Sequence, residues 1–249
     1  MARNARDCAL VLDALAGFDR ADPASRRFPP PHAAAGLTDE GRLDGLHIGY
    51  VRGFAESDGV NPDVRGACEA SLLVLQGLGA TIREVTLPDI RDFNACVQVL
   101  MTAEAFALHA RDFRTRADIV TPLTRGRITL GAFLSAEDYL RAQDMRRSLT
   151  AATVAAMSGL DALVYPCVTG DPPLLSDVTV FGYLDRPLMT APANVAGVPA
   201  ISVRAGTSMA GLPLSVQIAG RFGGDAMVLR IAHAYEQAAP TPDPWPAGL

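Results

Sequence analysis

Residues 199–220, PAISVRAGTSMAGLPLSVQIAG, contain two stretches in which apolar and polar side chains alternate. A period of two is typical of a β-strand that packs one face on a core. The segment 205–211 between the stretches can reverse the chain. The pattern therefore predicts a long antiparallel hairpin, with these side chains on its apolar face: Ile201, Val203, Leu212, Leu214, Val216 and Ile218.

A strand, a helix and a second strand are predicted upstream of this hairpin. The alternation in LHIGYV (46–51) predicts a short strand, and TIREVTL (81–87) is predicted to be another. The helix between them has Pro62 in its first turn and Gly79 at its end, where these residues are common. This order and spacing indicate a βαβ-type unit.

The other segments are mostly helical. Residues 93–157 favour helix, with a polar break near TPLTRGR (121–127), and DALVYPCV (161–168) is predicted to be a buried strand. A last helix is expected over 225–237, with Met227, Ile231 and Ala234 on one face. The Pro-rich tail at 240–249 cannot extend that helix.

The first predicted helix starts almost at once, since Asn4 is its one candidate N-cap. Gly17 lies where its C-terminus would be. No strand, turn or linker precedes it in this sequence. Its apolar residues recur at helical spacing on one face: Cys8, Val11, Leu12 and Leu15.

Composition indicates a globular protein with a sizeable core, because 49% of the 249 residues are hydrophobic. A net charge of −5 gives no overall attraction to nucleic acid or to an anionic membrane, so neither is expected as a partner. The most basic stretch, residues 109–127, is interpreted as solvated surface. No apolar run is long enough to cross a bilayer. Four widely spaced cysteines suggest buried thiols in a reducing, cytoplasmic compartment: Cys8, Cys68, Cys96 and Cys167.

Lysine is absent from the sequence, and all 22 basic residues are arginine. An arginine side chain stays protonated at any working pH and cannot accept a proton from a nucleophile. A mechanism that needs a catalytic lysine therefore cannot be completed within this chain.

Three segments resemble the amidase signature family, in the family's own order. Residues 190–237, which begin TAPANVAGVPAISV and continue through GLPLSVQIAGR, resemble its C-terminal segment. DALVYPCVTGDPP (161–173) resembles its Asp-x-Leu-x-x-Pro-Thr segment, with Cys167 at the usual Thr position. Residues 2–25 resemble the helix and Asp-Pro turn that follow its catalytic region. Together with the predicted elements, the resemblance implies an α/β fold in which helices flank both faces of a mixed β-sheet.

The resemblance also implies that the family's catalytic region lies upstream of the part represented here. That region carries a lysine, a serine on a cis peptide bond and a nucleophilic serine in a Gly/Ser-rich loop. This sequence has no Lys and no Ser-Ser pair, and its one Gly-Gly pair, Gly223 and Gly224, is interpreted as a flexible turn. No catalytic residue and no cofactor are therefore assigned to the chain. By motif match, four residues would border the substrate cleft: Cys167, Thr169, Thr190 and Asn194.

Structural roles are equally open for part of this set, since Thr190 and Asn194 could simply hold backbone in a loop before a strand. Ser208 is interpreted as a turn residue, because GTSMAG lacks the Gly-x-Ser-x-Gly spacing of a nucleophile elbow. His233 is expected to be a packed or surface residue. No histidine has neighbours at metal-ligand spacing, so no metal site is assigned.

Two hypotheses of function remain open for a single partial domain over 1–249. In the first, the chain is the C-terminal portion of an amidase that hydrolyses a small amide only when the other half is supplied. In the second, it is a non-catalytic module that binds a ligand or a partner. Self-association is also expected, because an unpaired strand edge and an apolar helix face would be exposed.

Overall fold

The computed structural model describes residues 1–25, 27–38 and 41–239, so the predicted tail at 240–249 lies outside the described residues. A five-stranded mixed sheet in the order β2-β1-β3-β5-β4 forms its centre. β1 pairs in parallel with β2 and β3, whereas β5 is antiparallel to β3 and β4. The mixed α/β fold predicted from the sequence is confirmed. The strands are β1 (His47–Tyr50), β2 (Thr81–Glu84), β3 (Ala162–Pro166), β4 (Ala200–Thr207) and β5 (Pro213–Gly220).

The predicted hairpin is present as β4 and β5, with Ile201 opposite Ile218 and Val203 opposite Val216. Its turn is shorter than expected, because β4 continues to Thr207 through a register shift that begins at Arg204. Ser208 closes this turn, since its backbone N–H donates to the Leu212 carbonyl at 2.8 Å. Leu212 therefore precedes β5 and is exposed, so its predicted place on the core face is wrong.

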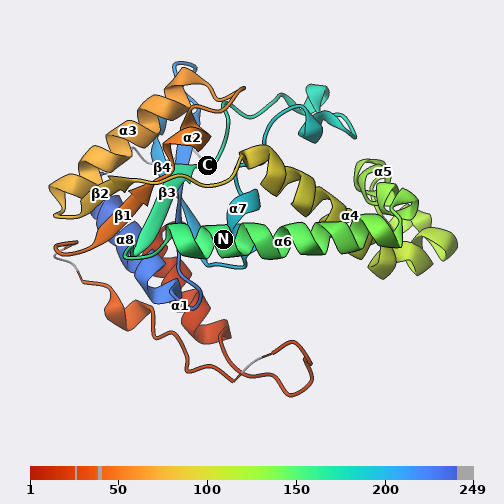
Figure 1. The fold of residues 1–249 in the computed structure, drawn as a ribbon, viewed down its shortest axis with the longest axis horizontal. Helices are drawn as coiled ribbons and strands as arrows, with labels where there is room; N and C mark the ends of the chain where they lie inside the picture. The colour runs from red at the N-terminus through yellow and green to blue at the C-terminus, as the bar shows by residue number, and fades with distance from the viewer. Residues whose placement is uncertain (26, 39–40, 240–249) are drawn as a thin grey trace, which may run out of the picture.

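Helices cover both faces of the sheet (Figure 1). α3 (Pro62–Gly77) and α8 (Asp225–Ala238) pack on the face that includes Val164 and Ile218. The opposite face, which includes Leu163 and Tyr165, packs against α4 (Ile90–Thr115), α6 (Ala136–Ala156) and α7 (Ala191–Ala196). β3 is consequently buried along its whole length, as its continuous apolar run predicts.

The βαβ unit is confirmed, with α2 (Arg52–Ala55) and α3 between the parallel strands β1 and β2. Asn61 caps α3 by accepting the backbone N–H of Asp63, and Pro62 occupies the first turn. β2 ends at Glu84, three residues before the predicted end. The Val85 N–H still donates to the carbonyl of Tyr50, which is the last residue of β1.

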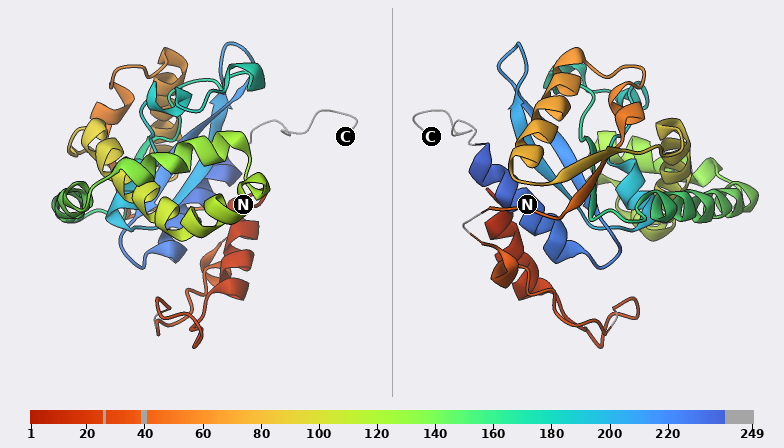
Figure 2. Two further views of the ribbon diagram at one scale, coloured as in Figure 1. Left: turned by 90° about the vertical axis from the view of Figure 1, so that its right-hand side faces the viewer. Right: turned by 60° about the vertical axis from the view of Figure 1, so that its left-hand side comes forward.

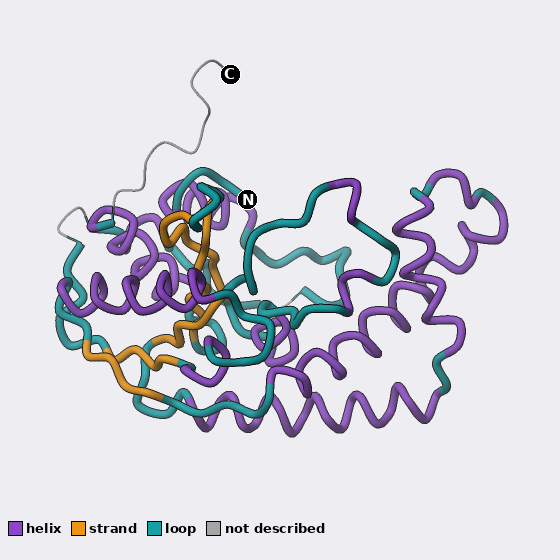
Figure 3. The backbone as a smooth tube through the Cα atoms, turned by 90° about the horizontal axis from the view of Figure 1, so that it is seen from above, coloured by secondary structure: helices purple, strands orange, loops and turns teal. Residues whose placement is uncertain are grey.

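The long helices α4 and α6 run side by side beyond the sheet and form an arm (Figures 1 and 3). The polar segment predicted to break the helical region is itself a helix, α5 (Pro122–Thr129), which Thr121 caps through the Thr124 N–H. The interruption lies earlier, where Arg116 leaves helical geometry at the end of α4. Short 3-10 turns complete the chain: η1 (Ala34–Gly36), η2 (Ala117–Ile119), η3 (Leu130–Phe133), η4 (Leu175–Asp177) and η5 (Gly182–Leu184).

α1 (Ala5–Leu15) lies against α8, as both views in Figure 2 show. Asn4 caps it as predicted, but the helix ends at an extended Ala16 instead of at Gly17. The buried residues of α1 are two alanines, Ala5 and Ala9, because these small side chains allow close approach to the neighbouring helix. The predicted apolar stripe is only partly covered: Cys8 and Leu12 are half-buried, whereas Val11 and Leu15 are 51% and 79% exposed.

The last helix matches its prediction, since Ile231 and Ala234 are buried and Met227 packs against the same core. Of the four cysteines, Cys68 and Cys96 are buried as predicted, whereas Cys8 and Cys167 are only half-buried. Among the described helices, none has the length and apolar character needed to span a membrane.

Candidate functional site

Three loops meet at the carboxyl edge of the parallel strands. β1 lies between β2 and β3, and the chain leaves β1 through α3 on one face but reaches β3 through α4 and α6 on the other. Connections that depart in opposite directions from neighbouring parallel strands leave a crevice outside the strand ends, where α/β proteins commonly bind ligands. The topology therefore indicates a candidate ligand site at the loops after β1, β2 and β3.

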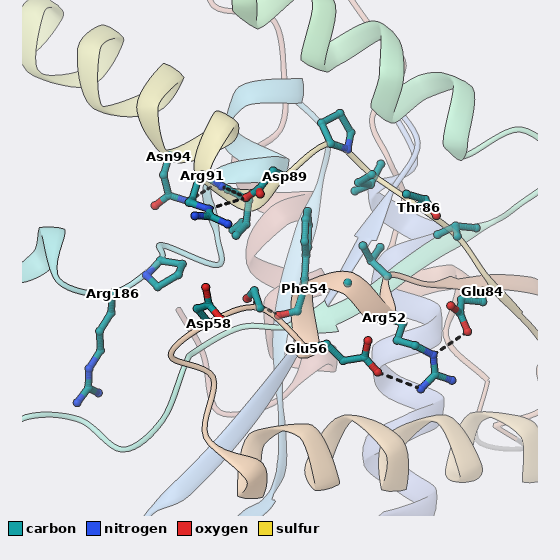
Figure 4. A pocket seen from close by; sticks show the side chains of 18 of the residues that line it. Arg52, Phe54, Glu56, Asp58, Glu84, Thr86, Asp89, Arg91, Asn94 and Arg186 are labelled. Atoms are coloured by element: carbon teal, nitrogen blue, oxygen red, sulfur yellow. Dashed lines mark hydrogen bonds and ion pairs between the residues drawn. The ribbon is translucent and has the colours of Figure 1, made fainter.

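A cleft with a volume of about 780 Å³ opens at this edge. It is lined by residues 51–54 and 56–58 after β1, by Glu84 at the end of β2 and residues 85–91 after it, and by residues 184–187 of the long loop after β3. Figure 4 shows Phe54 between two groups of charged side chains. The Phe54 ring packs edge-on against Phe93 and Tyr165, so the wall it forms is anchored in the core.

Ion pairs occupy one end of the cleft. The Arg52 guanidinium lies 2.7 Å from the Glu84 carboxylate and 3.7 Å from that of Glu56 (Figure 4). Glu84 lies on β2, whereas Arg52 and Glu56 follow β1, so the group links two loops. All three side chains are substantially exposed, and such pairs contribute little to stability.

Acidic side chains also line the other end of the cleft. The backbone N–H of Arg91 donates to Asp89 at 2.8 Å, and this hydrogen bond holds the pKa of the Asp89 carboxyl below its usual value. Asp58 and Asp185 come from the loops after β1 and β3 and line the same cleft. Carboxylates thus outnumber guanidinium groups in the lining, which favours ligands that carry positive or hydrogen-donating groups.

Asn94 holds the β3 loop over this end of the cleft. Its Oδ1 accepts the backbone N–H of Leu188 at 2.7 Å, and its Nδ2 donates to the carbonyl of Ile90 at 2.7 Å. The contact joins residues 94 positions apart in the sequence. No local pattern identified Asn94, because its role depends on a segment brought to it by the fold.

The four residues predicted to border a substrate cleft lie outside the lining of this cleft. Cys167 and Thr169 follow β3 at the same carboxyl edge, and the Thr169 carbonyl accepts the Asn61 N–H at 2.7 Å. Thr190 precedes α7, and the Asn194 Nδ2 donates to the Thr190 carbonyl at 3.0 Å. The structure therefore forms two pairs, one at the sheet edge and one at α7, and their contact with a substrate stays a prediction.

Nucleophilic side chains near the core are poorly suited to attack. Burial raises the pKa of the Cys68 thiol to about 12, and burial also raises the pKa of Cys96. Both thiols are therefore protonated at neutral pH, whereas the thiolate is the reactive form. Ser208 lies in the β4–β5 turn, as predicted, where its Oγ accepts the Leu212 N–H. In the part of the chain that the structure describes, no three His, Cys, Asp or Glu side chains are grouped to hold a metal ion.

Fold and cleft together define an α/β protein with a ligand-sized opening at the carboxyl edge of its parallel strands. The model of the Amidase family matches residues 1–229, so the chain belongs to the amidase family. The resemblance found in the sequence motifs is thereby confirmed.

Curated relatives of the chain include glutamyl-tRNA(Gln) amidotransferase subunits from several bacteria. The Geobacter metallireducens protein is 33% identical over 272 residues, with 95% of this chain and 53% of that protein covered. The Lysinibacillus sphaericus protein is 34% identical over 267 residues, with 95% and 53% covered. The chain spans about half the length of the curated relatives it matches.

Solved structures also match the chain over about half of their own length. One is the vestigial protein complex that reveals the evolutionary origins of an s-triazine catabolic enzyme, with 27% identity, a TM-score of 0.79, and 95% of this chain and 52% of that chain covered. Another is the peptide amidase PAM in complex with chymostatin, with 26% identity, a TM-score of 0.74, and 95% and 53% covered.

Proposed function

We propose that this chain is the C-terminal portion of an amidase that hydrolyses the carbon–nitrogen bond of a small amide. The match of the Amidase family model to residues 1–229 supports the class of reaction. The single observation that carries the finer proposal is the absence of lysine from all 249 residues. In this proposal, the chain supplies part of the substrate cleft, and the catalytic groups come from residues outside this sequence.

The chemistry explains this division. Amide hydrolysis needs an activated nucleophile, a base that takes its proton, and donors aimed at the tetrahedral oxyanion. The family uses a neutral lysine as the source of basicity, and no arginine can replace it. Cys167, Thr169, Thr190 and Asn194 are the residues proposed to border the substrate.

An activity assay with and without a complementing half tests the proposal. We expect the purified chain to hydrolyse simple amides and esters no faster than buffer. Adding an N-terminal amidase half that contains the Ser-Ser-Lys residues should restore turnover. A matched half whose lysine is replaced by arginine is the control and should restore none. Turnover by the chain alone that disappears in Ser208→Ala would contradict the proposal and identify a different nucleophile.

A non-catalytic binding module is the second candidate, and the observation that favours it is the 780 Å³ cleft in a chain without lysine. Such a module would bind a small molecule or protein and would stay inactive with every complementing half. Solubility of the mixture without turnover therefore favours this alternative.

A further inference from the structure

A second cavity, with a volume of about 410 Å³, lies beside the last strand of the sheet. Three elements that are distant in sequence surround it: the start of the chain with α1, the strand β4, and the C-terminal half of α8. Its charged and hydrogen-bonding side chains include Arg3, Arg6, Ser202, Arg204, His233 and Glu236. None of these residues lines the cleft at the carboxyl edge.

His233 points to a ligand in this cavity. The side chain lines the cavity although the residue is only 3% exposed, and its Nε2 is buried without a hydrogen-bond partner among the described residues. Leaving a buried ring nitrogen unpaired costs free energy, so buried polar atoms in folded proteins are almost always paired. An imidazole Nε2–H could donate to an acceptor placed in the cavity.

The charge of the lining indicates which acceptor fits. Arg3, Arg6 and Arg204 contribute three positive charges, and Glu236 is the one carboxylate among the described residues of the lining. Glu236 is already engaged, since it accepts the backbone N–H of Ala5 at 2.8 Å and so anchors α1 on α8. None of the three arginines is without a partner in the chain. A guanidinium has five N–H donors and can serve a further acceptor.

We propose that this cavity binds a small organic anion through a carboxylate or phosphate group. The anion would accept hydrogen bonds from His233 Nε2 and from the guanidinium groups, which are the side chains best suited to such oxyanions. Ser202 adds a hydroxyl on the β4 side. The volume exceeds that of a single small ion, so a molecule larger than its anionic group fits the cavity. The proposal is independent of the amidase proposal, because none of these residues has been placed at the substrate.

NMR of the histidine side chains tests the site directly, because the sequence has only four of them: His32, His47, His109 and His233. Sodium phosphate and sodium acetate are titrated separately into the full chain, with chloride used to keep the ionic strength constant. We expect the His233 signal alone to move and to saturate with at least one of the two anions. The anion that saturates at lower concentration identifies the preferred head group. No movement of His233, or equal movement of all four signals, would overturn the proposal.

A charge-matched pair of variants separates the site from general attraction. Arg6→Gln removes an exposed arginine of the cavity, and Arg83→Gln removes an exposed arginine of β2 that lines neither cavity. Loss of one charge-assisted contact should weaken anion binding about tenfold in Arg6→Gln and leave it unchanged in Arg83→Gln. Equal weakening in both variants would show that only net charge matters and would refute a specific site.

Discussion

β4 and β5 belong to one hairpin and have the same alternating pattern, yet they differ in how much of each strand is buried. β5 lies between β3 and β4, and its last five residues are all buried. Among the described residues, β4 has a neighbouring strand on one side only, and Ser202, which pairs with the buried Gln217, is exposed. The contrast shows that alternation predicts a strand, whereas the position of that strand in the sheet decides how much of it reaches solvent.

The largest effect is expected for Val216→Asp in β5. Val216 is buried in the core beneath α3 and α8, where a carboxylate would have no partner. We expect the free energy of unfolding to fall by about 4 kcal/mol or more, or the chain to fail to fold. Chemical denaturation monitored by circular dichroism measures this change in the free energy of unfolding. A loss below about 1 kcal/mol would show that the register of β5 is wrong.

The second prediction compares a cross-strand pair, Gln217→Asp and Ser202→Asp. From the alternation alone, Gln217 faces away from Val216, and its substitution would be milder unless helices cover both faces. They do, and Gln217 is only 6% exposed. We expect Gln217→Asp to cost about 2–3 kcal/mol and Ser202→Asp less than about 1 kcal/mol. Equal shifts in melting temperature would contradict the difference between central and edge strand.

The third prediction concerns association through exposed apolar and unpaired groups. Gly220 donates its N–H to Pro199 at 2.8 Å, so by antiparallel alternation the backbone groups of Ala200 and Ser202 point away from β5. Leu15 on α1 is also largely exposed. We expect concentration-dependent oligomers in analytical ultracentrifugation, weakened several-fold by Leu15→Glu. Leu108→Glu, on the exposed side of the arm, is the matched control and should leave the distribution unchanged. A monomer at all concentrations would contradict the prediction.

The smallest effect is expected at the opposite edge of the sheet. Glu84 on β2 pairs with Arg52, but both side chains are exposed and solvent screens the pair. Glu84→Gln should change the free energy of unfolding by less than about 0.5 kcal/mol. A larger loss in the same denaturation experiment would show that the cleft's ion pairs stabilise β2 specifically.

The predicted elements whose patterns are local are confirmed. Asn61 and Pro62 identify the start of α3, and the apolar run of β3 identifies a strand covered on both faces. The differences from the prediction have both distant and local causes. TPLTRGR is polar, yet it folds as α5, where the Arg127 guanidinium donates to the Val180 carbonyl from another loop. Leu212 lies outside β5 because the hairpin turn closes around Ser208.

The candidate sites were harder to predict than the fold. Motif matching selected residues along the chain, but the cleft is lined by loops from three separate strands, and Asn94 reaches residue 188 across it. His233 had no informative neighbours in sequence. Its significance emerges because α1 and β4 bury it beside a cavity that contains three arginines.

By itself, the sequence determined the alternation of strands and helices, the membership of the amidase family and the absence of lysine, because periodicity, motifs and composition are properties of the chain alone. The tertiary structure alone decided that β4 is an edge strand, that Gln217 and His233 are buried, and that two cavities lie at separate places. Burial and electrostatic environment depend on which segments pack together, and such segments are often distant in sequence: the Asn94–Leu188 and Ala5–Glu236 hydrogen bonds join residues 94 and 231 positions apart.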